Sequence, residues 1–134
     1  MSNRIDLQFL LVAVVLLLCG IGLGLTMGIK QDFQLAPVHA HFNLAGWASL
    51  ALFGLVYRAY PELAERKLAK VHFWLSAPAA VVFPIGIALS LLYEWPFLAI
   101  IGSIVWIAGA VVFLVQILSL FRASDARAAA VTAE

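Results

Sequence analysis

Two histidines, His39 and His41, stand at the start of an apolar segment that runs to Tyr57. An imidazole is costly in lipid unless something binds it, so an ionisable side chain inside a membrane span marks a functional site by default. Residues two apart on an α-helix lie about 200° apart around its axis, so the two rings face different neighbours. Imidazole nitrogen is a common ligand of haem iron and of transition metals. The pair therefore predicts a helix that supplies ligands on two of its faces.

Small residues follow the two histidines on the same helix. An α-helical step places Asn43 and Gly46 on the face of His39. The residues on the face of His41 are Ala45, Ala48 and Leu52. Small side chains leave clearance for a flat macrocycle, although they are also common at packed helix interfaces. We take Asn43, Ala45 and Gly46 as candidate cofactor-contacting residues beside the two histidine ligands.

Membrane helices must position these side chains. Of the 134 residues 65% are hydrophobic and 11% are charged, which leaves too little polar surface to cover a soluble globule. Uncharged runs at 7–29, 38–57, 71–93 and 95–121 are each long enough to cross a hydrocarbon core of about 30 Å. The predicted fold is all-α, a single domain over 1–134 with four transmembrane helices in a lipid bilayer. Residues 122–134 are expected to form a flexible cytoplasmic tail.

The distribution of charge predicts the orientation of the chain. Most cationic residues lie on the side that the N-terminus, the second loop and the C-terminus share, and only Lys30 lies on the other side. Those on the shared side are Arg4, Arg58, Arg66, Lys67, Lys70, Arg122 and Arg127. By the positive-inside rule both termini are cytoplasmic, as expected in a bacterial inner membrane. The formal net charge of +1 indicates no nucleic-acid partner, and the single Cys19 excludes a disulfide framework.

Two further features of the sequence are interpreted as structural rather than functional. Gly20, Gly24 and Gly28 form a stripe at four-residue spacing on the first helix, which predicts a face for close helix packing. His72 opens the third span from the cytoplasmic side, roughly 20–30 Å from the outer pair of histidines. It therefore cannot join them in one metal site of a single subunit, and we expect an interfacial or structural role for it.

Several short motifs occur in an order that resembles a known family. They are His39-Ala40-His41-Phe42, the Gly- and Ala-rich helix to Phe53-Gly54, Tyr60-Pro61, Lys70-Val71-His72-Phe73 and Phe83-Pro84. Together they resemble the tenth and eleventh helices of the haem-copper oxidase catalytic subunit, the subunit I superfamily, over about half the chain. That subunit has twelve helices in three four-helix arcs around a pseudo-threefold axis. The resemblance implies that this four-helix chain forms a homotrimer that rebuilds the ring.

In that family the His-x-His helix serves two haems, one on each face. His41 resembles the ligand of the low-spin haem and His39 that of the high-spin haem. In a symmetric trimer the resemblance implies one haem b at each interface, ligated by His41 of one subunit and His39 of the next. Two axial imidazoles are typical of an electron-transfer cytochrome. The implied function is electron transfer or binding of a diatomic gas, and the outer position of the histidines favours a periplasmic electron carrier as partner.

Departures from the family pattern leave other interpretations open. The third span has no His-His pair, no tyrosine is placed like that of the family's copper site, and the spans carry no Asp, Glu or Lys to relay protons. A minimal haem–metal oxidoreductase would place copper or another metal beside a five-coordinate haem held by His39, with His41 of a neighbour on the metal. A cofactor-free structural or assembly protein is a third alternative. A transporter is disfavoured because no span carries an ion-coordinating acid.

Overall fold

The computed structural model describes residues 4–131, with side chains as far as residue 122. In that part of the chain four helices are long and apolar enough to cross a membrane. They are Ile5–Lys30, Ala36–Ala59, Lys67–Tyr93 and Phe97–Arg122. Their ends differ from the predicted spans by only a few residues. The all-α fold with four helices fit to span a membrane is confirmed, as expected of an integral membrane protein.

The second of these helices is built from three segments in direct succession. They are α2 (Ala36–His41), the π-helix η1 (Phe42–Ala48) and α3 (Ser49–Ala59). The other elements are α1 (Ile5–Lys30), the short α4 (Pro61–Ala64), α5 (Lys67–Tyr93) and α6 (Phe97–Val131). Pro37 lies in the first turn of α2, where its missing N–H has no helical partner to lose.

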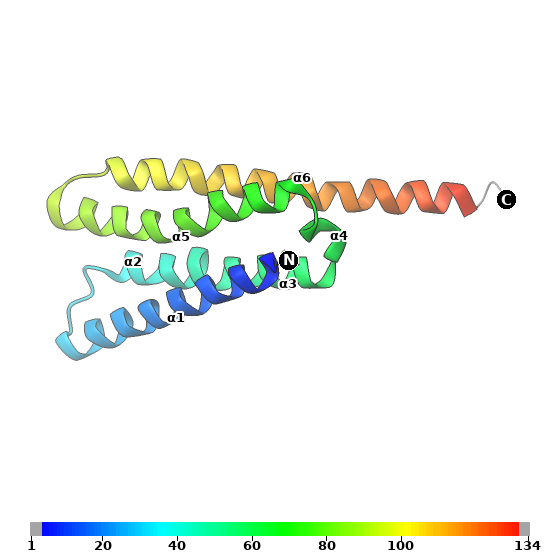
Figure 1. The fold of residues 1–134 in the computed structure, drawn as a ribbon. Helices are drawn as coiled ribbons and strands as arrows, with labels where there is room; N and C mark the ends of the chain where they lie inside the picture. Colours follow the sequence, from blue (N-terminus) through cyan, green and yellow to red (C-terminus); the bar gives the residue numbers. More distant parts are fainter. Residues whose placement is uncertain (1–3, 132–134) are drawn as a thin grey trace.

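The helices form two antiparallel pairs stacked in two layers (Figure 1). α1 packs against η1 and α3 in one layer, α5 packs along α6 in the other, and α2 joins the layers through its contact with α5. Left-handed residues end the first helix of each pair, Gln31 after α1 and Glu94 after α5. We call the end that holds the start of α1 and residues 60–66 the α4 end, and the end that holds residues 31–35 and 94–96 the loop end.

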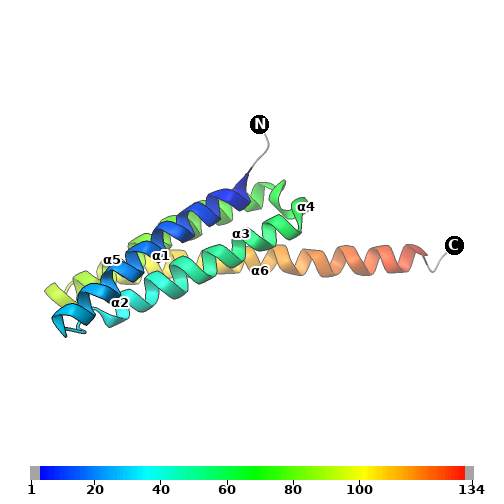
Figure 2. The same ribbon diagram turned by 90° about the horizontal axis from the view of Figure 1, so that it is seen from below.

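The last helix continues beyond the rest of the bundle. Figure 2 shows α6 running past the α4 end, away from the other helices. Residues 122–131, predicted as a flexible tail, therefore extend the fourth helix. This stretch is rich in alanine, which has the highest intrinsic helix propensity, so it needs no packing partner to favour a helix. The end of the predicted tail, residues 132–134, lies outside the described residues.

Glycines bring α5 and α6 into close contact. A Cβ atom on Gly86 would lie 2.6 Å from the Cα atom of Ala99, and one on Gly102 would lie 2.8 Å from the Cα atom of Phe83. Backbone therefore touches backbone along this hairpin, which is how small residues stabilise helix pairs in lipid.

The buried core lies toward the α4 end, between α1, α3 and α5. Its fully enclosed large side chains include Phe9, Leu50, Tyr57 and Leu63. Many large apolar side chains elsewhere are exposed on the outside of the bundle, as expected of helices that face lipid. At the α4 end the carboxylate of Asp6 closes the core, within 3.4 Å of Arg4 Nε and 3.6 Å of an Arg58 guanidinium nitrogen.

Candidate functional site

His39 lies in a groove on α1. Its ring is half-buried, and Nδ1 lies 2.8 Å from the carbonyl oxygen of Gly20. Because a carbonyl only accepts, Nδ1 carries the proton and donates, and Nε2 keeps its lone pair. A Cβ atom on Gly24 would lie 2.7 Å from His39 Cε1, whereas one on Gly22 or Gly28 would meet nothing within 4 Å. The glycine stripe on α1 is thus a packing face at Gly20 and Gly24, where residues of the second membrane helix contact it.

His41 faces the other layer. Its ring meets Phe83 of α5 edge to face, with ring centroids 4.8 Å apart and planes inclined by 74°. Nδ1 donates to the carbonyl oxygen of Pro37 at 2.7 Å, so this ring holds the same tautomer as His39. One imidazole therefore contacts α1 and the other contacts α5. The prediction that the pair faces two different neighbours is confirmed.

A π-helix begins directly after the second histidine. The Ser49 hydroxyl donates to the Leu44 carbonyl, five residues back, at 2.8 Å. Near the start of the segment the Asn43 amide donates to the His39 carbonyl at 2.8 Å, and the same amide nitrogen lies 3.5 Å from His39 Nε2. Asn43 thus supports His39 both through its backbone and beside its ring. π-Helical turns inside α-helices occur often at functional sites.

Ala45 and Gly46 lie inside the packed part of the same segment. Both are buried, and a Cβ atom on Gly46 would lie 2.9 Å from Leu16 Cδ1. The α-helical pattern predicted free space beside Gly46, below His39, but Leu16 occupies it. The lack of a side chain at Gly46 therefore allows α1 to pack closely. Their contact with a cofactor stays a prediction.

His72 belongs to a different cluster, toward the α4 end, and does not approach the pair. It is fully buried, its Nδ1 accepts from the Tyr57 hydroxyl at 2.9 Å, and Gln116 Nε2 donates to the same hydroxyl oxygen at 2.5 Å. The rings around it are Phe9, Phe53 and Phe113, with centroids 4.6 to 5.1 Å from that of His72. This packing agrees with a structural role. The Tyr57–Gln116 bond was not predicted from the sequence, where its one signal is a polar residue in each of two apolar spans.

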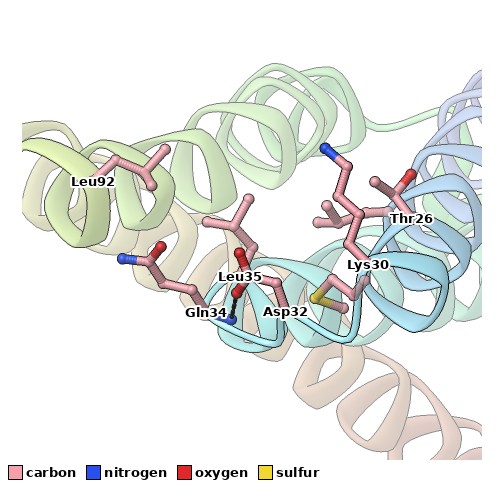
Figure 3. A pocket seen from close by; sticks show the side chains of 8 residues that line it. Thr26, Lys30, Asp32, Gln34, Leu35 and Leu92 are labelled. Carbon is pink, nitrogen blue, oxygen red and sulfur yellow. Dashed lines mark hydrogen bonds between the residues drawn. The ribbon is translucent and has the colours of Figure 1, made fainter.

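A small pocket opens at the loop end (Figure 3). Its volume is about 140 Å³, and Figure 3 shows Lys30, Asp32 and Gln34 at its wall. The Gln34 backbone N–H donates to the Asp32 carboxylate at 3.0 Å. Neither His39 nor His41 lines this pocket. Sites for drug-sized ligands measure about 300–1,000 Å³, so this pocket suits a smaller group than a macrocycle.

Metal ligands are dispersed over the described part of the chain. No group of three or more His, Cys, Asp or Glu side chains gathers within those residues. His39 and His41 lie on separate faces of the helix, and each ring donates through Nδ1 rather than Nε2; the Asn43 amide nitrogen lies 3.5 Å from Nε2 of His39. Any centre that uses both as axial ligands therefore requires two copies of this helix.

Comparison of the chain with protein-family models, with curated proteins and with solved structures gave no match. Kinship with the haem-copper oxidase subunit stays a prediction that depends on the motifs around the His39–His41 pair. The geometry of the His39–His41 pair is therefore the evidence on which the proposed function depends.

Proposed function

We propose that this chain is an integral membrane haem b protein in which His39 and His41 are the axial ligands. One observation carries the proposal: both rings donate through Nδ1 to a backbone carbonyl, Gly20 for His39 and Pro37 for His41. Histidines that ligate a metal are typically held in this way, because the bond made by one nitrogen orients the ring and leaves the lone pair of the other for the metal. Two such rings, two residues apart in an apolar helix, are a prepared ligand pair.

The ligands are shared between subunits of a homotrimer in this proposal. His39 contacts α1 and His41 contacts α5, so the rings of one chain diverge, and one ring from each of two chains completes a bis-histidine site. The trimer itself follows from the resemblance to one arc of a twelve-helix subunit. Haem b held by two imidazoles supplies one-electron transfer, and loss of one ligand opens a position for a diatomic gas.

The orientation in the proposal follows from charge. Arg4, Arg58, Arg66 and Lys67 surround the α4 end, so this end faces the cytoplasm of a bacterial cell and both termini are cytoplasmic. The histidines then lie in the outer half of the inner membrane. A periplasmic electron carrier is the redox partner that this position favours.

A cofactor-free structural protein is the second candidate. The observation in its favour is that each imidazole already has a hydrogen bond inside its own chain, and that the Asn43 amide lies 3.5 Å from His39 Nε2. A packing histidine would be satisfied in the same manner. The two candidates differ in the colour of the purified protein, because only the haem protein absorbs visible light.

Purification in mild detergent separates the candidates. The haem protein is expected to be red, with a sharp visible band after dithionite reduction and one haem per chain in a particle of three chains. A spectrum that shifts with carbon monoxide would favour the five-coordinate haem–metal oxidoreductase. A colourless protein, purified from cells supplied with haem precursors, would refute haem binding and favour the cofactor-free structural role. A monomer carrying its full haem content would refute the shared ligands.

Gly24→Ala is expected to impair haem binding without unfolding the chain. The new methyl group would lie 2.7 Å from His39 Cε1, so the ring must leave its groove and its bond to Gly20. Loss of a bond that orients a metal ligand costs about 10- to 100-fold in affinity. Haem content per chain, measured by pyridine haemochrome against protein mass, checks the expectation.

Gly28→Ala is the matched control for that variant, because the same methyl group there meets nothing within 4 Å. It lies one turn along the same helix and is expected to retain full haem content. Equal haem content in the two variants would show that His39 does not need its place on α1.

A further inference from the structure

The core near the α4 end contains polar atoms that lack a partner. His72 Nε2, Ser76 Oγ and Gln116 Oε1 find no hydrogen-bond partner among the described residues, and all three residues are 0% exposed. A buried polar group without a partner costs stability, and buried water commonly supplies the missing bond. These atoms lie closer to the α4 end than the histidine pair, whose rings contact Gly20 of α1 and Phe83 of α5, so they concern a different site.

The hydrogen bonds around His72 assign its tautomer. Gln116 Nε2 donates to the Tyr57 hydroxyl oxygen, which leaves the Tyr57 O–H to donate to His72 Nδ1. Since Nδ1 accepts, the neutral ring carries its proton on Nε2. The row therefore ends in a buried N–H donor that needs an acceptor.

Ser76 is the polar residue placed to share that partner. It lies four residues after His72 on α5, so the two side chains are neighbours with Cβ atoms about 5–6 Å apart. Side chains on a helix lean toward its N-terminus, which directs Ser76 toward the level of His72. On the facing helix Gly109 has no side chain, and the Ser76 hydroxyl lies too close to the position of a Gly109 Cβ atom to allow one.

Aromatic rings close the other sides of His72. Phe9 of α1, Phe53 of α3 and Phe113 of α6 pack on the imidazole with centroids within 5.1 Å, and none of them offers a strong acceptor. The Nε2–H and the Ser76 hydroxyl are thus two of the three unpartnered polar atoms in this core; the third, Gln116 Oε1, lies at the other end of the row, on the residue that donates to Tyr57. A hydroxyl both donates and accepts, so one small molecule can bond to both groups.

We propose that a single water molecule binds between His72 Nε2 and Ser76 Oγ as a permanent part of the core. It accepts from the imidazole and bonds to the serine hydroxyl, and so completes a hydrogen-bonded row that begins at Gln116 and passes through Tyr57. All donors in this row point the same way, which strengthens each bond. The site joins α3, α5 and α6 at the α4 end and is independent of haem binding.

Nitrogen-15 NMR of the whole protein in detergent tests the site at His72. With histidine labelled on both ring nitrogens, the expected result is a neutral ring protonated on Nε2, with a cross-relaxation signal from that proton to water that persists in the core. The Nδ1–H tautomer, or an Nε2–H without contact to water, would overturn the proposal. Because the chain has only three histidines, His72→Phe assigns the signal.

The sign of a stability change gives an independent test. If water bonds to Ser76, Ser76→Ala removes one hydrogen bond, and the unfolding equilibrium constant is expected to rise about fivefold. If the hydroxyl has no partner, the same change removes an unsatisfied buried group and leaves the constant unchanged or lower. Unfolding in mixed detergent and dodecyl sulfate micelles measures the constant, and a value that does not rise contradicts the water site.

Ser103→Ala is the matched control for that test. Ser103 lies in α6, and its hydroxyl already donates to the Ile100 carbonyl at 2.8 Å. Its replacement measures the effect of deleting a helical serine whose bond is local. The expected rise for Ser76→Ala exceeds that for Ser103→Ala, and the NMR signal of the His72 Nε2–H to water weakens in the Ser76 variant alone.

Discussion

His41→Ala is expected to lower the haem content of the purified protein more than about tenfold, or to convert its spectrum to that of an open site. The change deletes a proposed axial ligand, and its cost to the fold is small because, among the described residues, the ring has one local hydrogen bond, to the Pro37 carbonyl, and one edge-to-face contact, with Phe83. Reduced-minus-oxidised spectra and haem per chain are the measurements. Size-exclusion chromatography in detergent reports whether the variant still folds.

Two companion variants make this result specific. His39→Ala is expected to lose haem in the same way, since both ligands belong to each site. His72→Phe keeps an aromatic ring in the enclosure of Phe9, Phe53 and Phe113, so it retains haem even though the Tyr57 bond is lost. Loss of haem in the His72 variant, with His41→Ala unaffected, would refute the site assignment.

Gly86→Ala is expected to destabilise the α5–α6 hairpin by about 1–3 kcal/mol or more, the cost of overpacking a rigid contact. A methyl group on Gly86 would lie 2.6 Å from the Cα atom of Ala99 and from the carbonyl carbon of Leu98. Both are backbone atoms that cannot rotate away, so the two helices must separate. Thermal unfolding of the detergent-solubilised protein measures the loss.

Gly22→Ala is the control for this variant. A Cβ atom on Gly22 meets nothing within 4 Å, so only the gain in helix propensity remains, up to about 1 kcal/mol in favour of alanine. The two substitutions are chemically identical and are expected to shift the melting temperature in opposite directions. Equal melting temperatures would contradict the close backbone contact between α5 and α6.

The positions of the membrane helices could be predicted from composition because few backbone conformations are stable in lipid. Backbone groups in hydrocarbon must bond within their own segment, so every uncharged run of sufficient length becomes a helix. The predicted spans match α1, the α2–α3 helix, α5 and the membrane part of α6 for this reason. The opposite directions of His39 and His41 were equally predictable, since both lie in the α-helical segment α2.

The helix faces on which the residues after His41 lie could not be predicted from the sequence. The α-helical step grouped Ala45 with Leu52 below His41, yet Ala45 is buried and Leu52 is 60% exposed. Ala45 lies inside the π-helix η1 and Leu52 follows in α3; the π-helix changes the angle per residue, so a pattern that assumes one constant step loses its register. The packing of α1 against η1, with Leu16 beside Gly46, accompanies this change and depends on two segments far apart in the sequence.

The sequence by itself therefore determined that this chain has four apolar spans and that two imidazoles diverge near the start of the second. Only the tertiary structure decided which distant groups the buried polar side chains meet: Gly20 for His39, and Tyr57 with Gln116 for the row that holds His72. The physical reason is the range of the interactions. Hydrophobicity and helical bonding act over a few neighbouring residues, whereas the partner of a buried polar group is chosen by helices that meet only after the chain has folded.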